Sequence, residues 1–253
     1  MFDFSVKDRV ATVSMRNEPV NALTLAFVEQ LELLVDDLET RDDWNVVIIR
    51  SDLKIFSAGG DLAGMLSWMS AADADKRVAA YAHRVQQLMA RFENLPGVTI
   101  AFVEGAALGG GLELALSCDL RIATAKAKFG LPELKVGLLP AAGGTQRLTR
   151  QCGRGVATRI MLVGDILSAA EAVHVNLVEM LWENDQAEAE LAVIAGRIAA
   201  MPREALGIVK GCIAGQDAAD TDGFALEIIG IEKLVAGGEA KKRIARFMQR
   251  PDA

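Results

Sequence analysis

The chain has 253 residues and is 51% hydrophobic, 24% charged and 5% aromatic, a composition typical of a globular protein with an aliphatic core and unlike that of disordered, collagenous or membrane proteins. A formal net charge of −7 disfavours nucleic acid and anionic membranes as partners. Two histidines and three widely spaced cysteines offer no ligand cluster and no disulfide framework, so we expect no metal site and free thiols in a reducing compartment.

The N-terminal residues do not show the pattern expected of an export signal. Residues 1–7 lack a basic segment followed by an apolar one, and no later apolar run has the length that a bilayer requires. We therefore expect a cytoplasmic protein with no membrane partner.

Strand-like and helix-like segments alternate through the first half of the chain. The expected order is a hairpin over 4–15 with a break at 7–9, a helix over 27–38 capped by Thr24, a strand over 46–49, a helix over 78–92 that ends before Pro96, a strand over 99–103, a short helix after 109–111 and a strand over 119–124. After about residue 145 helices dominate, one of them opened by a capping box at 168–171. The pattern predicts an α/β fold with residues 1–195 as the core and 196–253 as a helical segment.

Residues 56–62 (FSAGGDL) form a loop of small residues directly after an expected core strand. Small side chains allow a ligand to approach the backbone closely, and loops held on a scaffold often carry function. An ordinary tight turn, which glycine pairs also favour, is the alternative reading of this segment.

A second glycine run, 109–111, stands where a short helix is expected to begin. Free N–H groups at a helix start favour an anion, whereas close packing of strand on helix is the structural alternative. The spacing fits neither of the glycine-rich nucleotide-phosphate motifs.

Two isolated carboxylates follow these loops. Glu113 stands alone in a run of Leu, Ala and Gly, and Glu133 follows the apolar segment 129–132. A buried carboxylate needs a partner or takes a raised pKa, as a catalytic acid or base requires. The alternatives are a solvent-exposed residue of the first helical turn for Glu113, and a helix start or a salt bridge to Arg147 for Glu133.

Other residues carry weaker signals. Met65, Trp68 and Met69 are spaced to line an acyl pocket, although plain core packing explains the same stripe. Asn176 is suited to the left-handed position that often ends a helix.

Together these motifs resemble the enoyl-CoA hydratase/isomerase, or crotonase, family over most of the chain. The resemblance rests on residues 19–23 (PVNAL), 56–62, 105–115 (GAALGGGLELA), 129–133 (FGLPE) and 140–148 (PAAGGTQRL). It implies a crotonase-like spiral of ββα units followed by a C-terminal helical trimerisation segment, and a homotrimer or a dimer of trimers.

The resemblance also implies the chemistry. The backbone N–H groups of Ala58 and Gly110 would form the oxyanion hole for a thioester carbonyl, and Glu113 and Glu133 would be the two hydratase glutamates, with Glu113 activating water and Glu133 delivering a proton. No separate cofactor is implied, because coenzyme A arrives as part of the acyl-CoA substrate. The residues expected to contact it are Ala58, Gly59, Gly60, Asp61, Leu62 and Gly110.

The expected activity is therefore that of an enoyl-CoA hydratase, which adds water to the 2,3 double bond of a 2-enoyl-CoA, with a role in fatty acid metabolism. Alternatives are an isomerase, decarboxylase or thioester hydrolase with the same oxyanion hole, or a non-catalytic RNA-binding scaffold, which the acidic charge disfavours. Lys242 and Arg243 replace the usual Glu-Gly of the family near the C-terminus, so no coenzyme A contact is assigned to Phe247 or Arg250. The resemblance leaves the acyl group and the direction of the reaction open.

Overall fold

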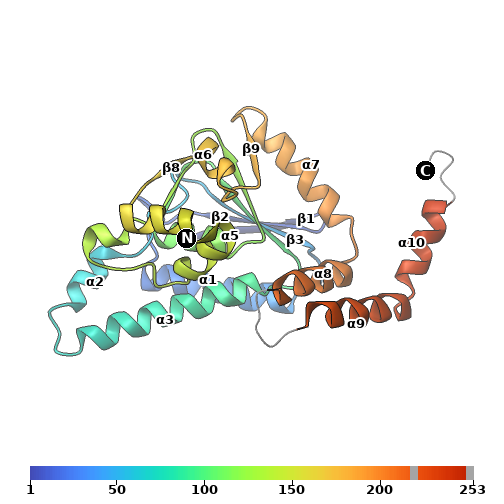
Figure 1. The fold of residues 1–253 in the computed structure, drawn as a ribbon, viewed down its shortest axis with the longest axis horizontal. Helices are drawn as coiled ribbons and strands as arrows, with labels where there is room; N and C mark the ends of the chain where they lie inside the picture. Colours follow the sequence, from blue (N-terminus) through green and yellow to red (C-terminus); the bar gives the residue numbers. More distant parts are fainter. Residues whose placement is uncertain (217–221, 249–253) are drawn as a thin grey trace.

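Two β-sheets form the centre of the molecule in the computed structural model, which describes residues 1–216 and 222–248 (Figure 1). The larger sheet has the strand order β1 (Phe2–Lys7), β2 (Val10–Met15), β3 (Val46–Ser51), β4 (Val98–Val103), β6 (Leu120–Thr124) and β9 (Met180–Trp182). The first pair is an antiparallel hairpin, and every later pair is parallel. The smaller sheet contains β5 (Ala106–Leu108), β7 (Lys128–Gly130) and β8 (Leu167–Ser168).

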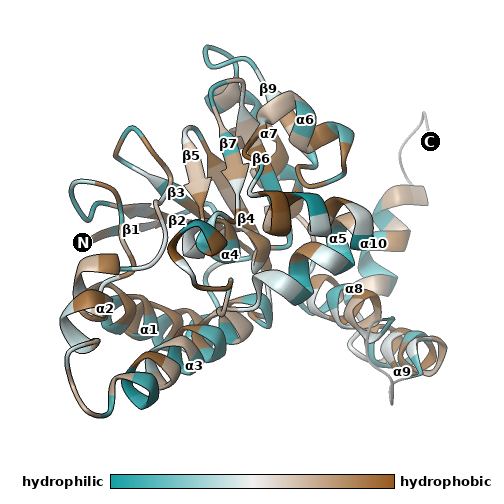
Figure 2. Ribbon diagram, turned by 60° about the vertical axis from the view of Figure 1, so that its left-hand side comes forward, coloured by the Kyte–Doolittle hydropathy of each residue, from teal (hydrophilic) through white to brown (hydrophobic). Residues whose placement is uncertain are grey.

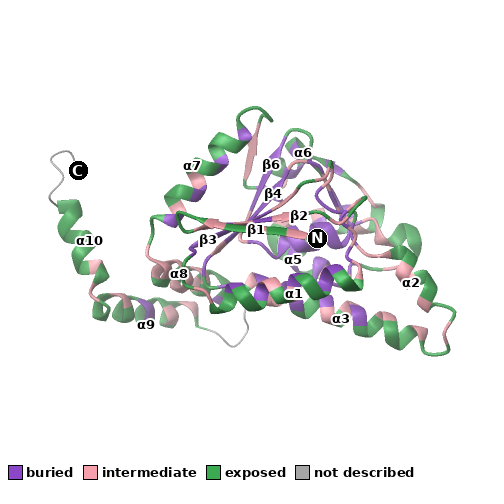
Figure 3. Ribbon diagram, turned by 180° about the vertical axis from the view of Figure 1, so that it is seen from behind, coloured by how far each residue is buried: buried purple, intermediate pink, exposed green. Residues whose placement is uncertain are grey.

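The parallel strands are buried on both faces, which is why they read as continuous apolar runs. Because side chains alternate along a strand, Val47 and Ile49 of β3 point into the main core, whereas Val46 and Ile48 point into a second core. That second core is covered by α7 (Ala187–Ala199) on the outer face of the sheet. The central strands are accordingly purple in Figure 3.

Two long helices, α1 (Leu25–Thr40) and α3 (Ala74–Glu93), lie side by side against the main core (Figure 1). Thr24 caps α1 by accepting the Phe27 N–H over 3.2 Å. Ion pairs from Arg84 to Glu32 at 2.6 Å and from Arg91 to Glu39 at 2.7 Å connect the two helices. The remaining helices before residue 200 are α2 (Leu62–Trp68), α4 (Gly110–Leu116), the 3₁₀ turn η1 (Glu133–Val136), α5 (Gly144–Thr158), the π turn η2 (Arg159–Val163) and α6 (Ala169–His174).

The last helices, α8 (Arg203–Gly215), α9 (Gly223–Ala236) and α10 (Glu239–Met248), extend away from the sheets (Figure 1). Lys210 anchors α8 through an ion pair of 2.8 Å with Asp119. Helix α9 packs on α8 and α10, and its apolar side chains remain exposed, with Phe224 at 83% and Val235 at 63%; Figure 2 colours much of it brown. Within residues 1–216 and 222–248, no helix combines the length and apolar character needed to cross a membrane.

The structure confirms most of the predicted elements. The hairpin turns at the predicted break, the Thr24 cap and the Ser168–Glu171 capping box are formed, and Asn176 adopts a left-handed φ of 59°. The predicted boundary after residue 195 falls inside α7, the first helix after the last strand, β9, among the described residues.

Candidate active site

The two glycine loops lie backbone against backbone. Ser57 and Ala107 form a parallel bridge, and the Leu108 N–H donates to the Ser57 carbonyl over 2.9 Å. Gly59 has a φ of 93°, and a Cβ atom there would lie 2.7 Å from both the Gly110 nitrogen and the Leu108 oxygen. Only glycine allows this approach.

Two N–H groups at this junction have no partner among the described residues. The N–H of Gly60 and that of Gly110, which begins α4, donate to no protein group, and the Gly60 nitrogen lies 3.5 Å from the Cβ position of Gly110. By contrast, the Ala58 N–H donates to the Val20 carbonyl over 2.9 Å, and the Gly59 N–H donates to the Ser57 hydroxyl oxygen over 3.1 Å. The N–H group expected from Ala58 is thus already used, and that of Gly60 is the free donor beside Gly110.

The segment at 19–23 serves as the scaffold of this loop. Asn21 is fully buried; its amide donates to the Ser51 hydroxyl over 2.7 Å and to the Phe56 carbonyl over 3.0 Å. The Leu23 N–H donates to the Gly59 carbonyl over 2.8 Å. Sequence reasoning noted the Asn-Ala-Leu pattern but missed this buried amide, whose partners are 30 and 35 positions away.

Glu113 lies on α4 and is only 3% exposed, so a solvent-facing role is excluded. Its Oε1 accepts the N–H groups of Ala142 and Gly144, each over 2.8 Å. The pKa of Glu113 is raised to about 7, chiefly because burial penalises the charged form; the Gly144 N–H acts against this shift and the charge of Glu133 adds to it. The carboxyl group therefore titrates where an acid–base catalyst works.

Arg147 holds the loop that binds Glu113. Its guanidinium is 8% exposed, donates to the Ala142 carbonyl over 3.0 Å, and pairs with Glu93 at 2.7 Å. The partner of Arg147 is Glu93, so the alternative of a salt bridge to Glu133 is wrong.

Glu133 begins η1 and projects toward the glycine run. Its Oε2 is buried and accepts no hydrogen bond, and its Oε1 lies 3.1 Å from the Cβ position of Gly109, whose φ is 53°. Burial raises the pKa of Glu133. A buried carboxyl oxygen without a donor is costly when charged, so this environment favours the protonated form.

These groups line one cavity of about 310 Å³, which contains Glu113, Glu133, Gly60 and Gly110 in its wall. Apolar side chains form most of the remainder, among them Leu23, Met65, Tyr81 and Val85. The site thus combines two free backbone donors with two carboxyl groups of raised pKa.

A family model described as enoyl-CoA hydratase/isomerase matches residues 5–252. The chain belongs to the enoyl-CoA hydratase/isomerase family. A probable enoyl-CoA hydratase of Bacillus subtilis is 40% identical over 73% of this chain and 69% of the relative. The 2,3-dehydroadipyl-CoA hydratase of Escherichia coli is 34% identical over 93% of this chain and 88% of the relative. The crystal structure of an enoyl-CoA hydratase from Bacillus anthracis superposes with a TM-score of 0.91 at 30% identity, covering 98% of this chain and 96% of that chain, so the crotonase fold is confirmed.

In this hydratase/isomerase the residues predicted to contact coenzyme A divide into two groups. Ala58, Gly60, Leu62 and Gly110 line the cavity. Gly59 and Asp61 do not; Gly59 makes the backbone contact described above, and the Asp61 carboxylate caps α2 by accepting the Gly64 N–H over 2.9 Å.

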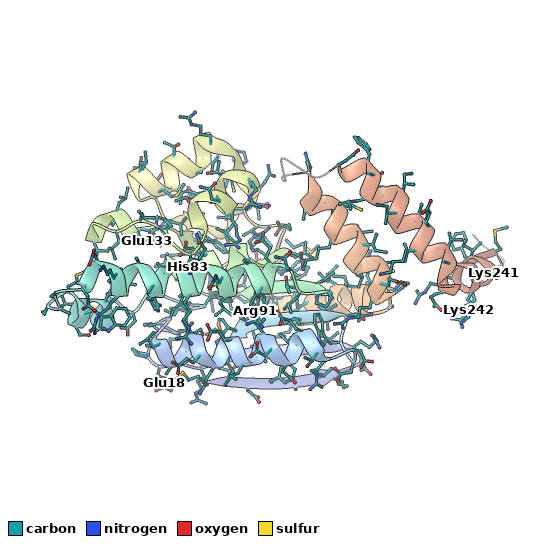
Figure 4. The ribbon with its side chains drawn as sticks, turned by 90° about the horizontal axis from the view of Figure 1, so that it is seen from below. Glu18, His83, Arg91, Glu133, Lys241 and Lys242 are labelled. Atoms are coloured by element: carbon teal, nitrogen blue, oxygen red, sulfur yellow. The ribbon has the colours of Figure 1, made fainter. Side chains whose placement is uncertain are left out.

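The C-terminal departure from the family pattern lies far from this site. Figure 4 shows Lys241 and Lys242 on α10 at the opposite end of the molecule from Glu133. Within the part of this hydratase/isomerase chain that the structure describes, Phe247 is 59% exposed, whereas Arg250 lies outside the described residues.

Proposed function

We propose that the chain is an enoyl-CoA hydratase, which reversibly adds water across the 2,3 double bond of a 2-enoyl-CoA to give a 3-hydroxyacyl-CoA. The observation that carries the proposal is a pair of carboxyl groups, buried Glu113 and half-buried Glu133, in the same cavity as two unpartnered N–H groups. Coenzyme A enters as part of the substrate.

The thioester carbonyl oxygen would accept hydrogen bonds from Gly60 and Gly110. Addition of water to C3 moves the electrons of the double bond onto this oxygen, and donors aimed at the developing charge stabilise the transition state. Gly60 replaces Ala58 as the proposed donor, because the Ala58 N–H donates to the Val20 carbonyl.

The surroundings of the two carboxyl groups support different roles. Two N–H donors on Oε1 favour the charged form of Glu113, so we assign it as the base that takes a proton from water while the oxygen bonds to C3. No group donates a hydrogen bond to Oε2 of Glu133. We therefore assign protonated Glu133 as the acid that delivers a proton to C2. Both carboxyl groups are needed: one removes a proton from the water that becomes the OH group on C3, and the other supplies the H on C2.

An isomerase needs only to move one proton between carbon atoms. The second carboxyl group has no task in that reaction, so its presence favours hydration over isomerisation. The net charge of −7 likewise gives no support to an RNA-binding scaffold.

The proposed assembly is a homotrimer or a dimer of trimers. The exposed apolar side chains of α9, such as Phe224 and Ile228, support an interface there, because exposed apolar patches often mark protein contacts.

The test is turnover of crotonyl-CoA by the purified chain, followed by loss of the absorbance of the conjugated double bond and identification of the 3-hydroxyacyl product. Hydration is expected. Conversion of a 3-enoyl-CoA to a 2-enoyl-CoA without hydration would favour the isomerase, and release of free coenzyme A would favour the hydrolase.

A further inference from the structure

An apolar groove of about 640 Å³ lies beside the cavity that contains the two carboxyl groups. Met65, Ala82 and Leu138 line both spaces, so the groove and the cavity share a wall. Its other walls come from the end of α2, the first turns of α3 and the segment after Glu133, with Met69, Val78 and Leu134 among them.

The residues that line this groove carry charge of one sign only. Asp75, in the first turn of α3, is the only ionisable residue among those that line it. Asp73, the N-cap residue of α3, adds a second carboxylate nearby, which is paired with Arg77 at 2.8 Å. The positive end of the helix dipole is thus already offset by acidic side chains.

The basic residue in the wall of the adjoining cavity points elsewhere. Lys135 lines the cavity but not the groove. Its side chain runs along the end of η2, where its Cε lies 2.9 Å and its Nζ 3.7 Å from the Cβ position of Gly164. The residues that line the groove include no Lys, Arg or His.

We propose that this groove selects acyl groups with an uncharged apolar tail and rejects those that end in a carboxylate. This inference rests on the proposed hydratase function and names its substrate class. An apolar tail packed against these side chains gains affinity, by about fourfold for each methylene removed from water (about 0.8 kcal/mol). A carboxylate at the same place finds no Lys, Arg or His among the lining residues and is repelled by Asp75.

The proposal predicts a different acyl specificity from that of a relative that matches 93% of this chain. That relative is named a 2,3-dehydroadipyl-CoA hydratase, and an adipyl group ends in a carboxylate. Overall similarity therefore does not define the acyl group here; the lining of the groove does.

The test compares two six-carbon substrates that differ at the end of the acyl chain. We measure kcat/KM of the full chain for trans-2-hexenoyl-CoA and for 2,3-dehydroadipyl-CoA, with crotonyl-CoA as the reference. The apolar substrate is expected to be preferred by about 100-fold or more. Hydration of crotonyl-CoA together with equal or better use of the dehydroadipyl substrate would overturn the inference but leave the hydratase intact, whereas no hydration of any of the three would overturn the proposed function itself.

A charge reversal tests the groove directly. Asp75→Lys is expected to raise kcat/KM for 2,3-dehydroadipyl-CoA by about tenfold relative to hexenoyl-CoA, because it supplies the missing cation. Asp185→Lys makes the same charge change at an exposed position in the turn before α7, outside the groove, and is expected to leave the ratio unchanged. An equal response of both variants would show a general charge effect and contradict selection by the groove.

Discussion

The N–H of Gly144 donates to Oε1 of Glu113 over 2.8 Å, and a Cβ atom at position 144 would lie 2.9 Å from the same oxygen. The hydrogen bond and the close approach come from one glycine at the start of α5. Gly144→Ala is therefore expected to displace the carboxyl group and to lower kcat by about 10- to 100-fold, because a misplacement of about 1 Å is costly in catalysis. Steady-state kinetics with crotonyl-CoA measure the effect.

The control is Gly155→Ala in the second part of α5, beyond the break at Gly153 (φ 78°), where an added Cβ meets nothing within 4 Å. It is expected to keep full activity. Equal losses of activity in both variants would show that the contact with Glu113 is not the cause.

The two carboxyl groups can be tested by isosteric replacement. Glu113→Gln and Glu133→Gln keep the shape of the side chain but cannot exchange protons, so each is expected to reduce kcat by about 10²-fold or more while KM changes little. The double variant should be little worse than either single variant, because the two groups act as a unit. Near-normal turnover in both single variants would contradict the paired mechanism.

The proposed oxyanion hole can be tested at the N–H group of Gly60. Gly60→Pro removes the free N–H and is expected to lower kcat by about 10²–10³, whereas Gly60→Ala keeps it and places a Cβ 3.3 Å from the flexible end of Met65. Thermal unfolding of both variants checks that the loop is intact. Full activity of a folded Gly60→Pro variant would show that the Gly60 N–H does not stabilise the thioester oxygen.

Glu113 also makes stability depend on pH. Its pKa is raised from 4.5 to about 7 by burial, so the native state is favoured while the group is protonated. This contribution is fully present below pH 4.5 and is lost as pH rises through about 7; over that window it is worth about 3 kcal/mol, at roughly 1.4 kcal/mol per pKa unit. Chemical denaturation of the wild type and of Glu113→Gln at several pH values should show the variant gaining relative stability as pH rises, and a constant difference would contradict a buried titrating group.

The same ionisation sets the rate at low pH. A base must be unprotonated, so kcat/KM for crotonyl-CoA is expected to rise as pH passes through about 7. The profile belongs to the coupled pair, since the charge on Glu133 contributes to the shift.

Periodicity in the sequence predicted the long elements, because a helix or strand with one buried face repeats its apolar residues at a fixed spacing. It could not predict the small sheet, whose strands β5, β7 and β8 have only two or three residues each. Strands this short contain too few residues for a period to be visible.

The site was predicted as a set of residues but not as a network. Glu113, Glu133 and Gly110 meet in one cavity, as the joint pattern suggested. The use of the Ala58 N–H by Val20, and the pairing of Arg147 with Glu93, 54 positions away, were not predictable, because no local pattern reports which distant group takes a given donor.

Tyr81 connects helix α3, which lines the proposed acyl groove, to the loop that carries Gly60. Its hydroxyl donates to the Leu23 carbonyl, and Leu23 is the residue that bridges to Gly60. The neighbouring α3 residues Val78 and Ala82 line the groove. An acyl group too bulky for the groove would displace α3, the helix whose Tyr81 holds the loop that carries Gly60. A larger acyl group is therefore expected to change kcat as well as KM.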